Sequence, residues 1–167
     1  LQLRLPTERY YEEEGRAELT PRDFGILMHR VFENAATTDE IYTAIEAMTQ
    51  DGVLDEKEAP RLRELVEKAL ADPVTAEWFG GRWQVVRNEN EIILPGSGTT
   101  RRPDRVMTDG ERAVVVDYKF GDRETARHRK QIREYLRLLR QMGYTRTEGY
   151  LWYVRLGRTE RVEEKED

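Results

Sequence analysis

Residues 102–120 read RPDRVMTDGERAVVVDYKF, and this stretch decides the fold. The segments 105–108 and 113–120 are strand-like, and the Asp109-Gly110 pair between them is typical of a tight hairpin turn. Such a turn makes the two strands antiparallel neighbours, so the start of the first lies beside the end of the second. The stretch therefore predicts a β-hairpin whose second strand is a buried apolar run.

Two carboxylates and one ammonium group are expected at the open end of this hairpin. Asp104 precedes the first strand and Asp117 lies near the end of the second, while Lys119 shares a sheet face with Asp117 because the two are two residues apart. Carboxylates hold hard divalent cations, and an ammonium group stabilises charge on a phosphate. A surface salt bridge is the alternative interpretation of a bare Asp-x-Lys. The preceding Pro103 and the apolar residues 114–116 favour the metal site over that alternative.

The rest of the chain divides into a helical half and a half with strands. Thr20-Pro21 and Thr38 are typical of helix starts, and the hydrophobic period changes from 3.6 to 2 after residue 80. The expected elements are a strand at 1–5, a connector at 7–19, helices from 21, at 38–49, 55–71 and 73–79, strands at 83–88, 91–94, 105–108 and 113–120, a helix at 124–142 and a strand at 150–156. This order predicts a mixed α/β (α+β) core with a helical N-terminal half.

The composition restricts the classes of function. The 167 residues include no cysteine, which excludes disulfides, cysteine-ligated zinc, iron–sulfur clusters and thiol catalysis. The lack of cysteine also fits a reducing, cytoplasmic location. No apolar run approaches the roughly 18 residues that a membrane-spanning helix needs, so we expect no membrane partner. Because the chain begins with Leu1 rather than Met, we expect it to be a piece of a longer polypeptide.

Charge is unevenly distributed along the chain. Residues 1–100 carry 11 basic and 20 acidic side chains, whereas residues 101–162 carry 16 basic and 9 acidic ones. The C-terminal part is therefore suited to a polyanion, although the whole chain has a net charge of −5. Many of these cations lie on the expected helix 124–142, for which a solvated arginine face is the alternative interpretation.

Several motifs resemble those of RecB-type nucleases in the PD-(D/E)XK superfamily. Pro103-Asp104 followed by Asp117-Tyr118-Lys119 resembles the pattern that gives the superfamily its name. The other motifs are a G-x-x-x-H helix at Gly25–His29, D-Y-K-x-G at Asp117–Gly121, Q-x-x-x-Y at Gln131–Tyr135 and a following strand at Gly149–Tyr153. Their order over residues 20–156 resembles the C-terminal nuclease domain of UvrD/Rep-type, AddA-like helicases.

The resemblance implies a restriction-endonuclease-like core, in which helices flank a central mixed sheet. It further implies one nuclease domain over 1–167: a helical part at 1–80 with the histidine motif, a catalytic core at 81–157 and a tail at 158–167. The implied partners are DNA, helicase domains of the same longer chain and a second helicase–nuclease subunit. The full-length chain is accordingly expected to be an ATP-dependent helicase as well.

The resemblance also implies roles for individual residues. The implied metal ligands are His29, Asp104, Asp117, the backbone carbonyl of Tyr118 and a glutamate, with Glu89 preferred to Glu91. The implied catalytic residues are Asp104, Asp117, Lys119, Gln131 and Tyr135. The implied cofactor is Mg²⁺, for which Mn²⁺ can substitute because one ligand is a histidine.

At two of these positions a purely structural role is the alternative interpretation. His29 lies at the edge of the apolar stripe of its helix, so it is otherwise a half-buried histidine beside the core. Gly25, one turn earlier, removes a side chain and lets another element approach. Tyr135 is otherwise a core residue that continues the stripe of Ile132 and Leu136, and His128 lies on the same helix edge.

These features together predict a metal-dependent deoxyribonuclease. The resemblance implies that it acts in DNA repair or recombination, as an exonuclease rather than an endonuclease. The expected DNA contacts are Arg102, Arg105, Arg127, Lys130, Arg133 and Arg137. Such contacts neutralise phosphates and do not read the base sequence. A catalytically inactive DNA-docking module of a helicase is the alternative function. The acids and the lysine are all present, which favours the active form. An unrelated acidic interaction domain would not explain the ordered motifs.

Overall fold

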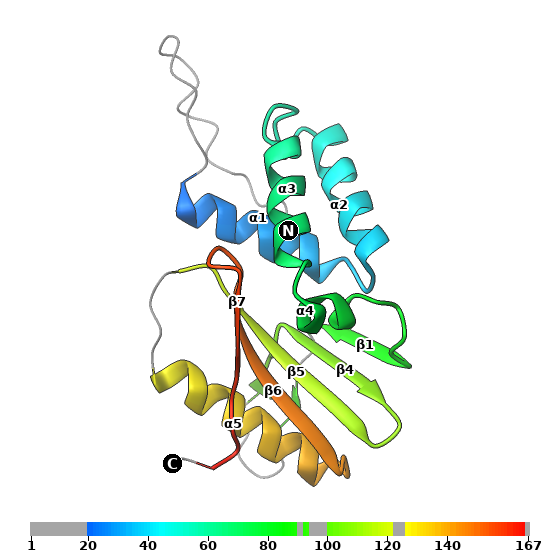
Figure 1. Cartoon of the computed structure of the whole chain (residues 1–167), viewed down its shortest axis with the longest axis vertical. Coiled ribbons are helices and arrows are strands. Elements are labelled where there is room, and N and C mark those ends of the chain that lie inside the picture. Colours follow the sequence, from blue (N-terminus) through cyan, green and yellow to red (C-terminus); the bar gives the residue numbers. More distant parts are fainter. Residues whose placement is uncertain (1–19, 90–91, 94–99, 122–125, 166–167) are drawn as a thin grey trace.

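Helices occupy most of residues 21–78. The computed structural model describes residues 20–89, 92–93, 100–121 and 126–165. The helices in the first part are α1 (Pro21–Glu33), α2 (Thr38–Gln50), α3 (Ala59–Ala69) and α4 (Pro73–Trp78). Figure 1 shows α1, α2 and α3 packed together beyond one end of the sheet. The predicted strand at 1–5 and connector at 7–19 lie outside the described residues.

Local side-chain chemistry sets where these helices begin. Thr20 caps α1 in a capping box, as its hydroxyl oxygen accepts from the Asp23 N–H while the Asp23 carboxylate accepts from the Thr20 N–H. The cap of α2 is Thr37, reciprocated by Glu40, so the predicted cap at Thr38 is wrong by one residue. Of the two threonines, Thr37 is the one followed three residues later by a glutamate, Glu40, as a capping box requires.

A five-stranded sheet follows the helices. Its strands are β1 (Val85–Asn88), β4 (Arg105–Asp109), β5 (Arg112–Lys119), β6 (Arg146–Tyr153) and β7 (Arg158–Arg161), in the order β1-β4-β5-β6-β7. β5 and β6 are parallel and are connected through α5 (Ala126–Gln141), whereas the other neighbours are antiparallel. A separate pair joins β2 (Ile92–Ile93) to β3 (Thr100–Arg101). The predicted hairpin is confirmed, with Asp109 opposite Arg112 and Arg105 opposite Val116.

Three predicted segments need correction. The third helix begins at Ala59 rather than 55, because Pro60 suits the first turn of a helix. The strand predicted at 150–156 runs instead from Arg146 to Tyr153. Residues 158–161, predicted to belong to a tail, form β7 along the edge of β6. Their polar sequence, RTER, has no apolar alternation that would indicate a strand.

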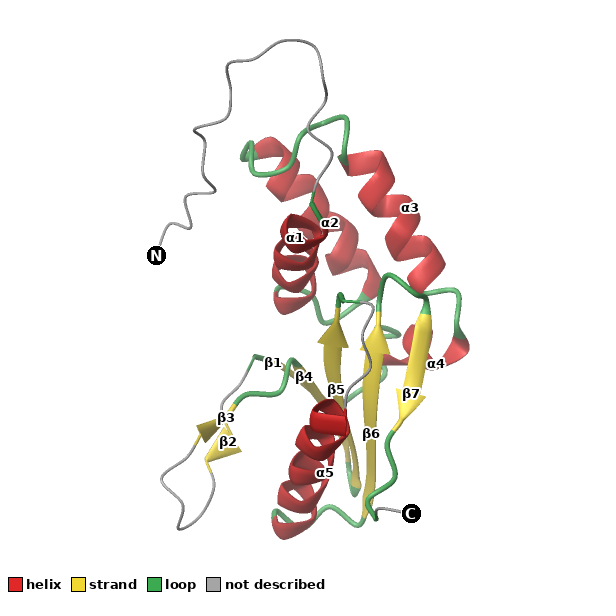
Figure 2. Cartoon of the chain, turned by 90° about the vertical axis from the view of Figure 1, so that its left-hand side faces the viewer, coloured by secondary structure: helices red, strands yellow, loops and turns green. Residues whose placement is uncertain are grey.

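Helices cover both faces of the sheet. Val114 and Val116 point to one face, where they join a buried cluster with residues of α1 to α4 such as Phe32. Val115 points to the other face and joins a second cluster with residues of α5 such as Ile132. Figure 2 shows α5 lying across this second face. The protein is therefore a mixed α/β structure with a restriction-endonuclease-like sheet flanked by helices, as the sequence predicted.

Within the described ranges, no helix combines the length and the apolar character that crossing a membrane requires. The helices instead bury one stripe against the sheet or against each other.

Candidate metal centre

Three acidic residues occupy one row across β1, β4 and β5. Asn88 lies opposite Arg105, and Arg105 lies opposite Val116, so one step further along the strands aligns Glu89, Asp104 and Asp117. The Glu89 N–H continues the ladder by donating to the Asp104 carbonyl at 3.0 Å. The predicted closeness of the two hairpin ends therefore follows from the observed register.

Two features of the backbone mark this row. The Tyr118 N–H donates to Asp104 Oδ2 at 2.6 Å, so the Asp104 carboxylate is bound to the backbone near the end of β5. Glu89 is the one non-glycine residue in the described ranges with a positive φ, at 53°. Such a conformation is uncommon for glutamate and is found mostly where surrounding structure holds it. It ends β1 at the point where the Glu89 side chain joins the acidic row.

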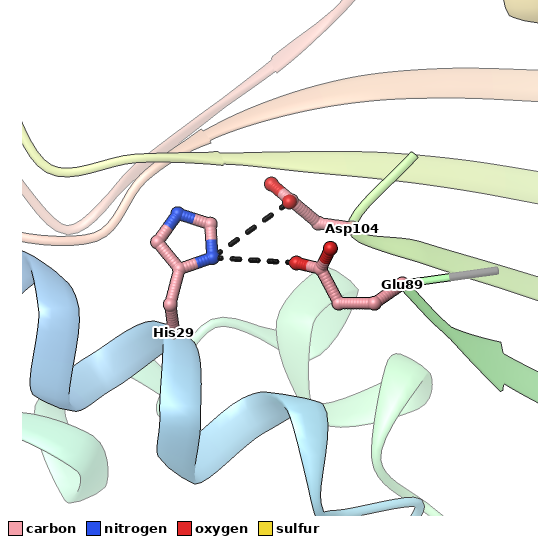
Figure 3. A group of neighbouring side chains, drawn as sticks. All are labelled: His29, Glu89 and Asp104. Carbon is pink, nitrogen blue, oxygen red and sulfur yellow. Dashed lines mark ion pairs between the residues drawn. The ribbon is translucent and has the colours of Figure 1, made fainter. Parts of the chain in front are cut away.

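His29 reaches the row from α1. Its Nδ1 atom lies 3.6 Å from Glu89 Oε1 and 3.7 Å from Asp104 Oδ1. Figure 3 marks these two contacts with dashed lines. The ligand atoms of His29, Glu89 and Asp104 all lie within 4.8 Å of one another. The structure thus brings His29 and Asp104, two of the predicted ligands, together with Glu89, the preferred glutamate. Glu91 lies outside the described residues.

Gly25 places α1 close enough for this contact. A Cβ atom at Gly25 would lie 3.3 Å from Phe120 Cβ, so the absence of a side chain lets the segment after β5 approach the helix. One turn later, the His29 ring packs edge-on against Phe120, with centroids 4.8 Å apart. The position of His29 is therefore fixed by packing on one side and by the acidic residues on the other.

The electrostatic environment favours a cation. Burial, and next the negative charge of Asp117, raise the pKa of Asp104 to about 9, against the opposing effect of the Tyr118 N–H. Burial lowers the pKa of His29, although Glu89 and Asp117 oppose this shift. A neutral imidazole beside crowded carboxylates can donate lone pairs to a metal, and a dication would relieve the repulsion between the carboxylates.

The donor set fits a divalent cation of the Mg²⁺ or Mn²⁺ type. Mg²⁺ holds its ligands at about 2.0–2.1 Å, so two of its donor atoms lie at most about 4.2 Å apart. The distances from His29 Nδ1 to Glu89 Oε1 and Asp104 Oδ1, 3.6 and 3.7 Å, lie within that limit. Carboxylate oxygens suit Mg²⁺ and Mn²⁺, and the imidazole nitrogen adds a preference for Mn²⁺. The residues present therefore fit the predicted cofactor.

Asp117 and Lys119 form a buried ion pair next to this cluster. Their side chains are 6% and 19% exposed, and Lys119 Nζ lies 2.5 Å from Asp117 Oδ2. Asp117 is not among the three clustered residues, so its role as a direct ligand stays a prediction, as does that of the Tyr118 carbonyl. The pair faces α5, because Asp117 and Lys119 alternate with Val116 and Tyr118, which face the α1 side.

Two residues of α5 predicted to line the site lie on the buried side of that helix. Gln131 Nε2 donates to the hydroxyl oxygen of Tyr135 at 3.0 Å, and the Tyr135 side chain is fully buried. Burial, and then the positive charge of Lys119, lower the pKa of His128, which indicates that the start of α5 lies near the ion pair. Tyr135 is thus a core residue, as the alternative interpretation expected, and its hydroxyl also holds Gln131.

The predicted DNA contacts fall into different environments. Arg102 is exposed at the rim of the cluster and pairs with Glu89, Nε to Oε2 at 3.6 Å. Arg105 is fully buried, so the prediction that it contacts DNA is wrong. The sequence contained a signal for this, because the hairpin register places Arg105 on the same face as Met107, which is in the core.

The cations of α5 divide into two groups. Arg129 and Arg140 pair with Glu160 and Glu164, and Arg133 donates to the carbonyl of Glu163. The other predicted contacts on α5, Arg127, Lys130 and Arg137, are exposed. The segment 158–164 therefore provides partners for the arginines on one edge of α5 and leaves the cations of the other edge exposed to solvent. The sequence did not predict that this segment lies against α5.

Fold and site together are typical of one class of protein, the α/β phosphodiesterases. In these proteins carboxylates lie together at the edge of a mixed sheet, and a lysine follows the last carboxylate by two residues, as Lys119 follows Asp117. The chain belongs to the PD-(D/E)XK nuclease superfamily, whose family model matches residues 2–167. Members of this superfamily usually use divalent metals and act on DNA. Among curated proteins, none matches the chain.

Proposed function

We propose that this chain is the metal-dependent DNA nuclease domain of a helicase–nuclease that acts in DNA repair or recombination. The observation that carries the proposal is the cluster of His29, Glu89 and Asp104, one sheet position from the Asp117–Lys119 ion pair. Mg²⁺ is the proposed physiological ion, with Mn²⁺ as a substitute. We place Asp117 and the Tyr118 carbonyl among the ligands in the loaded site.

The side chains divide the work of phosphodiester hydrolysis. A divalent ion in this centre supplies Lewis-acid polarisation of the phosphate and activation of water. His29, Glu89, Asp104 and Asp117 would hold that ion, and Asp117 also orients the Lys119 ammonium group. Lys119 stabilises the negative charge that develops on the phosphate, and Gln131, held by Tyr135, contacts the same phosphate or Lys119.

DNA approaches over the exposed cations. Arg102 lies at the rim of the metal cluster. Arg127, Lys130 and Arg137 are spread over residues 127–137 of α5, or about 15 Å of helix. These contacts neutralise phosphates and leave the base sequence unread, which suits a nuclease that degrades DNA of any sequence.

The order of the motifs supports the wider setting of this proposal. The G-x-x-x-H, PD, D-Y-K-x-G and Q-x-x-x-Y motifs occur in the order found in RecB-type, AddA-like nuclease domains. We therefore propose that the chain is the C-terminal part of a cytoplasmic UvrD/Rep-type helicase, whose helicase domains and a second subunit are its partners. We further propose exonuclease action, so linear DNA should be degraded and covalently closed circles should not.

A cleavage assay with matched variants tests the proposal. Lys119→Ala should abolish cleavage of linear DNA in Mg²⁺ or Mn²⁺ while leaving metal binding measurable by calorimetry, because the lysine is not a ligand. Asp117→Ala should lose both cleavage and metal. Lys68→Ala is the control, since Lys68 also pairs with a carboxylate, Glu64, but lies exposed on α3.

The same assay separates the two candidate functions. If the unmutated chain binds DNA but cuts no DNA in either metal, even when joined to its helicase, the docking-module function replaces the nuclease. If Lys119→Ala retains full cleavage, the assignment of the lysine is wrong.

A further inference from the structure

Arg105 is a charged side chain in the interior of the protein. It is fully buried, and the Phe79 ring lies 4.0 Å from its guanidinium carbon. The four acceptors of its two Nη atoms are all neutral, and none is a carboxylate. Burying an arginine without a carboxylate partner is costly, so such a group is retained where its fixed fork of donors holds several segments together.

The acceptors come from the segments that carry the metal-binding side chains. Nη1 donates to the Ala35 carbonyl at 2.7 Å, just beyond the end of the helix that carries His29. Nη1 also donates to Asn88 Oδ1 at 3.1 Å, and Asn88 directly precedes Glu89. Arg105 itself directly follows Asp104. The Arg105 guanidinium therefore contacts the neighbour of Glu89 and the end of the helix that carries His29, and Arg105 is itself the neighbour of Asp104.

Two further contacts complete the arrangement. Nη2 donates to the carbonyls of Ala36 and Trp78, each at 2.7 Å, and so joins the α1–α2 connection to the end of α4. Asn88 Nδ2 donates to the Ala35 carbonyl at 3.1 Å, which closes a triangle between Arg105, Asn88 and the end of α1. Carbonyls after a helix lack intrahelical partners and carry partial negative charge, which a cation satisfies.

We infer that Arg105 is a positioning residue that sets the metal affinity of the centre, by holding α1, β1 and β4 at the separation at which His29, Glu89 and Asp104 meet. The inference rests on the proposed function, because it concerns the same metal centre. It replaces the DNA contact that the sequence predicted for Arg105. The loss of residues that orient metal ligands typically weakens metal binding by about 10–100-fold.

The test compares metal affinity with stability. Arg105→Met should weaken Mn²⁺ binding at least about ten-fold, measured by calorimetry at a temperature where circular dichroism shows the variant folded. Arg112→Met is the matched control. Arg112 is a guanidinium on the same hairpin that donates to Glu77 and Glu148, but it lies about 16 Å along β5 from Asp117. It should lower the melting temperature and leave Mn²⁺ affinity unchanged.

Two more variants keep the test decisive if Arg105→Met does not fold. Arg105→Lys keeps the positive charge but loses the planar set of guanidinium donors. Asn88→Ala keeps the guanidinium but removes the hydrogen bonds that join Asn88 to Arg105 and to the Ala35 carbonyl. Both variants should weaken Mn²⁺ binding. Folded Arg105 and Asn88 variants that bind Mn²⁺ as tightly as the unmutated chain would overturn this inference alone. Failure of the unmutated chain to bind Mn²⁺ would overturn the proposed function together with it.

Discussion

Asp104 links the stability of the protein to the chemistry of the proposed centre. Its pKa is raised from an ordinary value of 3.8 to about 9, first by burial and then by Asp117. Between these values the carboxyl keeps its proton in the folded chain and loses it in the unfolded chain. The folded state then binds more protons, so this group makes the free energy of unfolding of the metal-free protein fall as pH rises.

Asp104→Asn should remove this effect. The amide oxygen still accepts from the Tyr118 N–H, and no charge has to be buried. With a chelator present at pH 8, we expect a gain on the order of 1 kcal/mol, or about 2–4 °C in melting temperature, that disappears near pH 4. Mn²⁺ should then stabilise the unmutated chain but not the variant.

Thermal unfolding followed by circular dichroism between pH 4 and pH 8 checks this expectation. Asp109→Asn is the control, because Asp109 is an exposed acid at the turn of the same hairpin. A variant Asp104→Asn that melts at or below the temperature of the unmutated chain at pH 8 would contradict the proposed origin of the pKa shift.

At single positions the sequence predicted the candidate centre better than its surroundings. His29 and Asp104 could be chosen because their motifs are local, and the hairpin register brings the carboxylate row together. Glu89 could not be separated from Glu91 by sequence, since its place depends on a positive φ that no pattern encodes. Arg105 was misassigned because a charged residue was taken to lie at the surface.

Among the elements, those with strong local signals were predicted and those that depend on pairing were not. The hairpin follows from the Asp109-Gly110 turn, and α1 follows from its cap and its proline. β7 forms because β6 offers an unpaired edge, not because residues 158–161 favour a strand. The start of β6 was missed because Arg146-Thr147-Glu148 is polar, although Glu148 pairs with Arg112.

The approach of α5 to the sheet depends on Gly149 in β6. A Cβ atom there would lie 2.4 Å from Ile132 Cγ2, and a β-branched side chain in a helix has little rotamer freedom to move away. Gly149→Ala should therefore destabilise the protein by about 1–3 kcal/mol in denaturant unfolding. Gly121→Ala, at a position with no atom within 4 Å of the new Cβ, should change stability little.

A double-mutant cycle identifies the contact responsible. Ile132→Ala alone should cost about 2–5 kcal/mol, but its combination with Gly149→Ala should cost less than the sum, because the alanine relieves the clash. Additive effects would mean that the helix does not meet Gly149 through Ile132.

On the scale of the whole molecule, charge is unevenly divided along the chain. The first 100 residues are acidic overall and supply His29 and Glu89 to the metal cluster, whereas Asp104 comes from the part of the chain that is rich in cations. The excess of cations in residues 101–162 is reduced where Glu160 and Glu164 cover one edge of α5. The net charge of −5 therefore says little about the surface that DNA meets.

Two double variants with the same change in net charge test which edge of α5 binds DNA. Lys130→Gln with Arg137→Gln removes exposed cations, and Arg129→Gln with Arg140→Gln removes cations that already have glutamate partners. The slope of log affinity against log salt for duplex DNA, measured with a chelator to prevent cutting, should become shallower by roughly 0.9 for each lost phosphate contact. We therefore expect a change of nearly two for the exposed pair and little change for the partnered pair, because glutamate rather than phosphate already neutralises those arginines. Equal slopes for both double variants and the unmutated chain would mean that α5 is a solvated arginine face and that DNA binds elsewhere.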